Sequence, residues 1–323
     1  MTWCFFPTPY HSFDLPLRGL SELWIKRDDL NGLAGGGNKT RKLRHYLQHI
    51  QVQGYTALVT EGAPQSNHCR QTAAMGAANG LKVVLVLGGN GPRQASGNLL
   101  IDEILGAEII HCSQADRPAE VGRALKRLEA SGHRPLHIPV GGSAPIGVEA
   151  YAEGITEWYE EQRGLGWLPD TIVHASSSGG TQAGLALGVA RLDLPIEVLG
   201  ISVDHSQEVL SATVEALIDA TETNPDIAAR AKASARYSAD YLGHGYARPT
   251  SREADAISFT AKHSGIILDP VYSGRAMVGF IDMVERGHFD SKRVVFWHTG
   301  GMPSIHPFGS PSSWPCHASS NGD

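Results

Sequence analysis

Short runs of β-branched and apolar residues, separated by stretches rich in alanine and leucine, constrain the fold of this chain more than any other feature. Between most of the runs lie helical patterns such as RQTAAMGAANG and TQAGLALGVARL. Strands that alternate with helices across Gly-rich turns indicate α/β domains with open, mostly parallel twisted sheets flanked by helices. The expected strands are residues 57–60, 83–87, 108–112, 136–140, 171–175, 196–203 and 294–299.

The order of these patterns predicts two domains, which suits a chain of 323 residues. Residues 40–150 hold about four strand–helix alternations and end at the Gly-rich stretch PVGGSAPIG. The opening segment contains its own strand, ELWIKRDDL, which cannot complete the pattern of the middle unit. We therefore expect a smaller α/β domain, residues 40–150, inserted in a larger domain formed by residues 1–39 and 151–323.

The net charge of the chain argues against nucleic-acid and membrane partners. A net charge of -6 and a pI of about 6.2 provide no basic surface for nucleic acid or for an anionic membrane. Apolar runs fall short of the roughly 18 residues needed to span a bilayer. The first residues, MTWCFFPTPY, lack the basic region of a signal peptide. We expect a cytoplasmic protein without nucleic-acid or membrane partners.

The cysteines and histidines give no indication of a metal site. The four cysteines are widely spaced and form no CxxC pair, which argues against a zinc site or a disulfide framework. The 15 histidines show no H-x-x-x-H or H-E-x-x-H arrangement. We therefore expect reduced thiols and no bound metal.

The stretch LAGGGNKTRKL, residues 33–43, places Lys39 directly behind a glycine run. A nucleotide-binding P-loop is disfavoured because Asn38 separates the last glycine from the lysine. Apolar residues recur at helical spacing from Leu43 onward, and Asn38 is a suitable N-cap for that helix. Lys39 would then lie in the first helical turn, where the helix dipole disfavours a cation. A solvated lysine and a neutral amine used for Schiff-base chemistry both remain open.

Three further Gly-rich or polar loops follow predicted strands. HASSSGGTQAGL, residues 174–185, offers hydroxyls and backbone N–H groups at a helix N-terminus, which suits a phosphate monoester. EGAPQSNHCRQTAA, residues 61–74, places Gln65 to His68 where they could bind a carboxylate or simply cap the helix. Cys69 is interpreted as a small core residue of that helix. FWHTGGMPS, residues 296–304, allows close approach of a flat ligand.

Together these loops indicate one kind of ligand. In open α/β sheets such loops meet where ligands bind. The ligand must carry a phosphate, a carbonyl group for the lysine and a second anionic group. Pyridoxal phosphate with an amino-acid substrate meets all three requirements.

The chain resembles the pyridoxal-phosphate enzymes of the tryptophan-synthase-β type (fold type II). The resemblance is to the branch that contains D-cysteine desulfhydrase and 1-aminocyclopropane-1-carboxylate (ACC) deaminase. It extends from residue 25 to residue 304 and implies that the cofactor lies in the cleft between two α/β domains. The matching motifs are IKRDD, GGNKTRKL, GAPQSNHCRQTAA, IPVGGS, SSSGGTQAGLA, GYARP, LDPVYSGRAM and HTGGMPS.

The resemblance implies roles for individual residues in binding the cofactor. Lys39 would bind pyridoxal 5'-phosphate covalently and remove the α-proton of the substrate. Asn67 would donate a hydrogen bond to the phenolic oxygen of the cofactor, and Thr299 would lie near the pyridine nitrogen. Tyr246 would stack near the ring. The phosphate would be held by Ser178, Gly179, Gly180 and Thr181.

The substrate side of the site follows from the same resemblance. Ser66, with Asn67 and His68, would bind the substrate carboxylate, and in ACC deaminases the serine at this position is also proposed as a nucleophile. Tyr272 would face the substrate. We therefore expect Lys39, Ser66 and Tyr272 to be the catalytic residues.

Two positions separate the branches of the family. ACC deaminases carry YEG and HLGG where this chain has Tyr272–Ser273–Gly274 and the stretch HTGG at 298–301. D-Cysteine desulfhydrases resemble this chain at both positions. A carboxylate near the pyridine nitrogen strengthens the electron sink. A hydroxyl gives a weaker one, which suffices for elimination of a good leaving group.

We therefore expect an α,β-eliminating lyase that converts D-cysteine to pyruvate, ammonia and hydrogen sulfide. ACC deaminase and L-cysteate sulfo-lyase are the alternative activities within the same branch. A non-catalytic homologue that only binds the amino acid or the cofactor is disfavoured by the intact lysine and phosphate-loop hydroxyls. Members of the family form dimers, and the resemblance implies a homodimer here.

Overall fold

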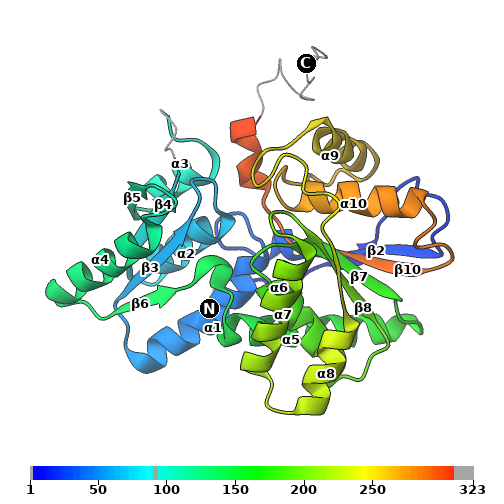
Figure 1. The fold of residues 1–323 in the computed structure, drawn as a ribbon, viewed down its shortest axis with the longest axis horizontal. Coiled ribbons are helices and arrows are strands. Elements are labelled where there is room, and N and C mark those ends of the chain that lie inside the picture. The colour runs from blue at the N-terminus through cyan, green and yellow to red at the C-terminus, as the bar shows by residue number, and fades with distance from the viewer. Residues whose placement is uncertain (1–2, 90–93, 309–323) are drawn as a thin grey trace.

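The computed structural model describes residues 3–89 and 94–308 and contains two parallel-type sheets, each covered by helices (Figure 1). The larger sheet has the strand order β1-β2-β10-β7-β8-β9, and only β1 runs antiparallel to its neighbour. Its strands are β1 (Tyr10–Ser12), β2 (Glu22–Arg27), β7 (Thr171–Ser176), β8 (Glu197–Ser202), β9 (Ala235–Ser238) and β10 (Arg293–His298).

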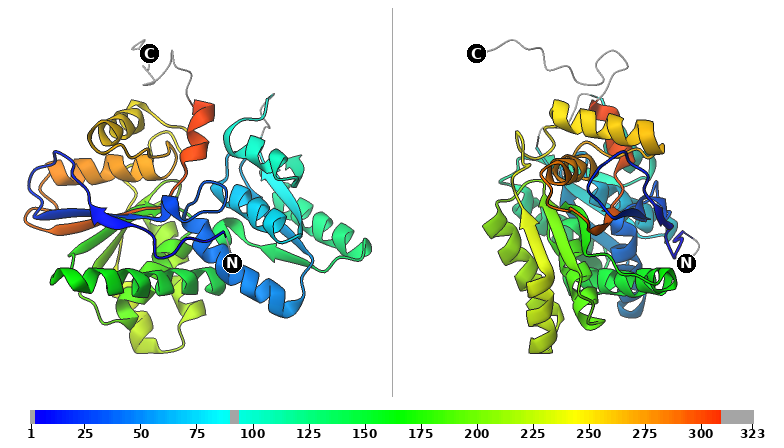
Figure 2. Two further views of the ribbon diagram at one scale, coloured as in Figure 1. Left: turned by 180° about the vertical axis from the view of Figure 1, so that it is seen from behind. Right: turned by 90° about the vertical axis from the view of Figure 1, so that its right-hand side faces the viewer.

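Helices cover both faces of the larger sheet, and its central strands are therefore buried on both sides. One face packs against α5 (Pro145–Gln162), α6 (Gly180–Arg191), α7 (Gln207–Thr221) and α8 (Pro225–Ser234). The other face packs against α9 (Ser251–Ser264) and α10 (Ser273–Glu285). Figure 2 shows this sheet between its two helical layers.

The smaller sheet has the order β5-β4-β3-β6 and is parallel throughout. Its strands are β3 (Ala57–Gly62), β4 (Lys82–Gly88), β5 (Glu108–Cys112) and β6 (Pro135–Ile138). On one face lie α1 (Asn38–Gln53), α2 (Asn67–Ala78) and α3 (Gly97–Ile104), and on the other lies α4 (Arg117–Ala130). Short 3-10 helices occupy Asp28–Leu30 (η1), Val140–Gly142 (η2), Arg163–Leu165 (η3) and Met302–Phe308 (η4).

The predicted α/β class with mostly parallel sheets is confirmed, and each apolar run forms a strand. Strand β2, from the opening segment, pairs in parallel with β10 and so belongs to the larger sheet, as its sequence suggested. The sequence did not indicate β9, whose four residues include an exposed Arg236 at the edge of the sheet.

The predicted domain boundary near residue 150 falls inside helix α5. Val148 already packs in the core of the larger sheet, with Tyr151 and Ile155 of the same helix. The turn η2 links β6 of the smaller sheet to α5. The boundary near residue 39 coincides with the start of α1.

A buried carboxylate joins segments that are far apart in the sequence. Asp28 accepts hydrogen bonds from Arg41 Nε (2.9 Å), Tyr151 Oη (2.6 Å) and Trp297 Nε1 (2.8 Å). Arg41 also donates to Glu157 (2.8 Å). Hydrogen bonds and the charge of Arg41 keep the pKa of Asp28 below its usual value although burial opposes this. This network connects η1, α1, α5 and β10.

None of the helices in the described ranges is long and apolar enough to cross a membrane.

Candidate active site

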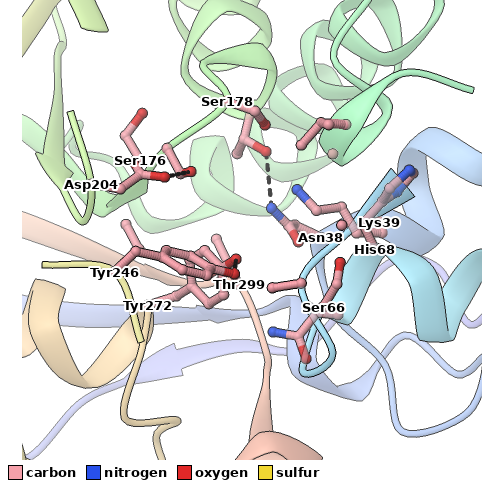
Figure 3. A pocket seen from close by; sticks show the side chains of 18 of the residues that line it. Asn38, Lys39, Ser66, His68, Ser176, Ser178, Asp204, Tyr246, Tyr272 and Thr299 are labelled. Atoms are coloured by element: carbon pink, nitrogen blue, oxygen red, sulfur yellow. Dashed lines mark hydrogen bonds between the residues drawn. The ribbon is translucent and has the colours of Figure 1, made fainter. Parts of the chain in front are cut away.

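A pocket of about 430 Å³ lies where the carboxyl ends of strands from both sheets meet (Figure 3). Its walls come from the last residue of β4, from residues that follow β3, β5, β6, β7, β8 and β10, and from the start of α1. This is where ligands bind in open α/β sheets. Every residue predicted for the site except Gly180 lines this pocket: Lys39, Ser66, Asn67, His68, Ser178, Gly179, Thr181, Tyr246, Tyr272 and Thr299.

The glycine run forms a tight left-handed loop that leads into α1. Residues 32–37 all have positive φ angles, including the non-glycine residues Leu33 (29°) and Ala34 (50°). The helix begins at Asn38 with Gly37 as its N-cap, so the expectation that Asn38 caps it was wrong. Asn38 instead donates its side-chain N–H to Thr181 Oγ1 (3.1 Å), because its side chain faces the other wall of the pocket.

Lys39 lies in the first turn of α1 with its amine in the pocket. Burial lowers the pKa of this lysine to about 8, so a larger fraction of the amine is neutral than in a solvated lysine. From the sequence we expected the helix dipole to disfavour the charged lysine. In the structure the pKa is lowered by burial of the amine away from water. A Cβ on Gly141 would lie 3.4 Å from Lys39 Nζ and 2.3 Å from Ser178 Oγ. Glycine at that position therefore lets both groups approach one point.

The loop between β7 and α6 carries the predicted phosphate site. Gly179, in the left-handed region with φ 74°, makes the sharp turn after which α6 begins at Gly180. Ser178 Oγ lies 2.8 Å from Ser143 Oγ, and Ser177 donates to Asp204 Oδ2 (2.7 Å). The N–H of Gly180 donates to Ser143 Oγ (3.3 Å), which explains why Gly180 stands behind the pocket wall.

A second lysine lies beneath this loop. Lys42 is fully buried and donates to the Gly141 carbonyl (3.1 Å) and to Ser143 Oγ (3.3 Å). A Cβ on Gly180 would lie 2.8 Å from Lys42 Nζ. Burial and the nearby charge of Lys39 lower the pKa of Lys42. The sequence analysis missed this residue, although its spacing of three from Lys39 in a helix places both on one face.

The loop before α2 forms the small-domain wall. Ser66 is the N-cap of α2 and accepts a hydrogen bond from the N–H of Cys69 (3.2 Å), so it combines capping with a place in the pocket. Asn67 and His68 follow in the first turn, where free backbone N–H groups suit an anion. Cys69 is buried in the core of the smaller sheet, as expected.

The hydrogen bonds of His68 fix its tautomer. Thr60 donates its single hydroxyl proton to the Ile138 carbonyl (2.7 Å), so at 2.8 Å from His68 Nε2 the threonine oxygen must accept. His68 therefore carries its proton on Nε2, and burial keeps its pKa well below the usual value. The neutral ring has an acceptor at Nδ1 and no second donor. A carboxylate at this loop would therefore have to be bound by N–H groups other than the imidazole.

Two tyrosines close the pocket on the large-domain side. Their hydroxyls, Tyr246 Oη and Tyr272 Oη, lie 2.6 Å apart. Burial raises the pKa of Tyr246 to about 12. Asp269 fixes the backbone at Tyr272 by accepting its N–H (2.8 Å). Ser273 donates to Asp269 Oδ1 (2.6 Å) and stays outside the pocket wall, so its hydroxyl is directed away from the ligand site.

Other wall residues were not indicated by the sequence motifs. Gln114 and Arg117 follow β5, and Asp204 and His205 follow β8. Their position after the carboxyl ends of parallel strands was the available signal. Arg117 Nε lies 2.8 Å from Glu61 Oε2. The described residues contain no group of three or more His, Cys, Asp and Glu side chains arranged to hold a metal ion.

Comparisons with known proteins agree on one family. The chain matches the model of the pyridoxal-phosphate dependent enzymes over residues 4–300. It is 38% identical over 294 residues to a D-cysteine desulfhydrase of Klebsiella pneumoniae (strain 342), with 89% of each chain covered. It is 37% identical over 297 residues to a D-cysteine desulfhydrase of Salmonella newport (strain SL254), again with 89% of each chain covered.

Solved structures agree with this result. The crystal structure of an ACC deaminase homologue is similar with a TM-score of 0.81 at 32% sequence identity, covering 94% of this chain and 91% of its own. A pyridoxal 5'-phosphate-dependent aspartate racemase, 14% identical, shares the fold with a TM-score of 0.64 over 91% of this chain and 90% of its own.

Proposed function

We propose D-cysteine desulfhydrase activity for this chain, which belongs to the family of pyridoxal-phosphate-dependent enzymes. The reaction is the α,β-elimination of D-cysteine to pyruvate, ammonia and hydrogen sulfide. The observation that carries the proposal is the identity of 37–38% to D-cysteine desulfhydrases along 89% of the chain, together with the presence of the predicted site residues in one pocket.

The residues of the pocket fit pyridoxal 5'-phosphate. A buried amine with a lowered pKa, Lys39, suits the aldehyde, because the neutral amine is the nucleophile. Ser178, Thr181 and the start of α6 suit the phosphate, with Lys42 beneath them. Glycine at 141 leaves the space between the lysine and the phosphate loop. The ring would be held by Asn67, Tyr246 and Thr299, and the phosphate also by Gly179 and Gly180.

When bound, the cofactor withdraws electrons from the α-carbon of the substrate. Lys39 Nζ takes the α-proton, and burial, which lowers its pKa to about 8, raises the fraction of neutral amine that can act as a base. The N-terminus of α2 at Ser66 and Asn67 binds the substrate carboxylate. The C–S bond breaks, its electron pair leaves with sulfur, and released aminoacrylate is hydrolysed to pyruvate and ammonia. Tyr272 faces the substrate from the opposite wall.

ACC deaminase is the second candidate function. The similarity of the solved ACC deaminase homologue, with a TM-score of 0.81, supports it. Against it stands the stretch HTGG at 298–301, which places a hydroxyl, that of Thr299, rather than leucine in the pocket. The 32% identity to that homologue is also below the identity to the desulfhydrases.

L-Cysteate sulfo-lyase activity is favoured by one feature of the pocket wall. Arg117 lines the pocket, and its Nε forms an ion pair with Glu61 Oε2 (2.8 Å). A guanidinium presented in this way suits an anionic substituent such as a sulfonate. Because Glu61 offsets its charge, we rank this activity below D-cysteine desulfhydration.

A substrate screen tests the proposal. The purified enzyme is assayed for pyruvate and sulfide from D- and L-cysteine, pyruvate and sulfite from both enantiomers of cysteate, and 2-oxobutyrate from ACC. We expect the highest kcat/KM for D-cysteine. Lys39→Ala should remove turnover together with the visible absorbance of the bound cofactor. Greater turnover of ACC or cysteate, or a Lys39→Ala enzyme that keeps turnover and colour, would contradict the assignment.

We further propose that the enzyme is a cytoplasmic homodimer. Phe5, Leu30 and Met302 are 60%, 48% and 48% exposed and line one surface groove behind the glycine loop. An exposed apolar surface of this kind favours contact between copies. Light scattering coupled to size exclusion should give twice the chain mass, and Phe5→Glu should shift it toward the monomer. A monomeric wild-type enzyme would rule the dimer out.

A further inference from the structure

The loop that leads to Lys39 has a strained backbone conformation, which other groups must hold in place. Six consecutive residues, 32–37, lie in the left-handed region, which costs energy for Leu33 and Ala34 because of their Cβ atoms. At Gly36 the backbone is so close to the Asp29 carbonyl that a Cβ would lie 2.0 Å from its oxygen. Such strain persists only where surrounding groups hold the backbone in place.

Two side chains of α2, in the smaller domain, hold this loop. The Arg70 guanidinium donates through Nη1 to the Ala34 carbonyl and through Nη2 to the Gly36 carbonyl (3.2 Å). Gln71 Nε2 donates to the same Gly36 carbonyl (2.8 Å). The contacts therefore fix two carbonyls just before the helix that begins with Asn38 and Lys39.

Arg70 also contacts the other functional loop of its domain. Its Nη2 lies 3.4 Å from Asn67 Oδ1, which in addition accepts a hydrogen bond from Asn98 Nδ2 (2.8 Å). One guanidinium thus lies between the loop that carries Lys39 and the side chain proposed to meet the cofactor. A planar group with donors at fixed angles can bind all three oxygens, whereas the point charge of a lysine cannot.

The partners of Arg70 show that it does not serve as a member of an ion pair. It is fully buried, yet none of its nitrogens forms a salt bridge, and both oxygens of the nearby Asp102 have no hydrogen-bond partner within the described residues. A buried cation is costly unless its donors are satisfied. Here the carbonyls of the strained loop, together with Asn67, satisfy the two terminal nitrogens, whereas Nε has no partner within the described residues.

We propose that Arg70 is a positioning residue, which sets Lys39 and Asn67 in register for cofactor binding and proton transfer by clamping the Ala34 and Gly36 carbonyls. The proposal rests on the proposed function only in assigning Lys39 to the cofactor and to the substrate proton. Arg70 itself does not line the pocket, so it would touch neither substrate nor cofactor. It acts through the loop backbone and through Asn67.

The test compares Arg70→Lys with wild type and with Asp102→Asn as the matched control. Asp102→Asn changes the carboxylate whose charge acts most strongly on Arg70 but leaves every donor to the loop in place. Two quantities are measured: the rate at which the visible cofactor band returns when pyridoxal phosphate is added back after its removal, and kcat for D-cysteine. We expect Arg70→Lys to slow both, with kcat falling on the order of 100-fold while KM changes little. Asp102→Asn should stay within about twofold of wild type.

A folded Arg70→Lys enzyme with wild-type band return and kcat overturns the proposal. An equal loss in Asp102→Asn overturns it as well, because that loss could not come from the carbonyls. Band return does not depend on the identity of the substrate, so it tests the clamp even if D-cysteine proves not to be turned over. If Arg70→Lys does not fold, Gln71→Leu is measured instead, since it removes a donor to Gly36 without exposing a buried charge. Slower band return in Gln71→Leu supports the clamp, and an unchanged rate overturns it.

Discussion

Arg41 and Arg70 are both buried and both flank the glycine loop, yet their partners are of opposite kinds. Arg41 binds the carboxylates of Asp28 and Glu157, and these charges keep its pKa above the usual value. Arg70 binds uncharged oxygens, and burial lowers its pKa to about 10. The first arginine is part of a charge-balanced network that joins distant segments. The second has no carboxylate partner among the described residues and instead holds backbone carbonyls of the glycine loop in place.

The carboxylates near the two arginines differ in the same way. Asp28 is stabilised as an anion and its pKa is lowered. Burial raises the pKa of Asp102 to about 8, which favours the neutral form of this side chain at neutral pH. The comparison teaches that a buried arginine beside an aspartate is not by itself a salt bridge, because the number of hydrogen bonds to the carboxylate decides its state.

The largest effect on stability is expected from Asp28→Asn. The substitution removes the counter-charge of Arg41 and one acceptor from Tyr151 and Trp297. Breaking a buried ion pair on one side costs about 3 kcal/mol or more. Urea unfolding should show this loss as a lower midpoint at neutral pH. A variant within about 0.5 kcal/mol of wild type would show that the two arginines are equivalent after all.

The pH dependence of this network has a definite sign. The folded-state pKa of Asp28 is lowered below its unfolded value, so its contribution is complete above about pH 4 and is lost as pH falls through the folded pKa. In acid, the stability of wild type should therefore fall toward that of the Asp28→Asn variant. Midpoints of both proteins measured from pH 7 down to about pH 3 should converge, and parallel curves would contradict the assignment.

Trp297→Phe should have a smaller effect. It removes only the indole N–H bond to Asp28 Oδ2 (2.8 Å) and leaves the charge pair intact. A hydrogen bond to a charged group contributes about 1.5 kcal/mol or somewhat more. The midpoint of urea unfolding should fall by roughly half as much as in Asp28→Asn. A loss equal to that of Asp28→Asn would mean that packing of the indole, rather than its hydrogen bond, stabilises β10.

Asp102→Asn should have the smallest effect near pH 4, and the variant should gain stability relative to wild type as pH rises. Because the folded pKa is raised to about 8, wild type loses stability as pH rises from the unfolded pKa of about 4 toward 8. Asparagine lacks this penalty. The variant should match wild type within about 1 kcal/mol near pH 4 and become the more stable protein by pH 8. Unfolding midpoints at both pH values check this, and a variant less stable at pH 8 would contradict it.

The sequence predicted the fold well because its signals are local. Apolar runs bounded by glycine marked the strands, and the isolated run ELWIKRDDL was correctly excluded from the middle unit. The short edge strand β9 was missed because ARYS has neither the length nor the apolar character of a buried strand. The predicted boundary at residue 150 falls inside α5, because the core that Val148 joins is a property of the tertiary packing.

The site could be predicted only where motifs are contiguous. Lys39, Ser66 and the loop at 176–181 stand in recognisable stretches, and the structure brings them into one pocket. The tautomer of His68 could not be predicted, because it depends on Thr60 and on a carbonyl of the neighbouring strand. Nor could the roles of Arg70 and Lys42 be read from their motifs, since both act through carbonyls of loops remote in sequence.

The pairing of β2 with β10 has a consequence for the order in which the molecule is built on the ribosome. The strands of the smaller sheet lie at 57–138, so that sheet can form long before β10 has been synthesised. The N-terminal strand must wait, on the order of ten seconds, for a partner near the other end of the chain. Asn38 donates its N–H to the Thr299 carbonyl (2.9 Å), so the lysine loop takes its final place only then. The nascent chain therefore completes the surroundings of Lys39 last, and shorter fragments contain that lysine without the contact to residue 299.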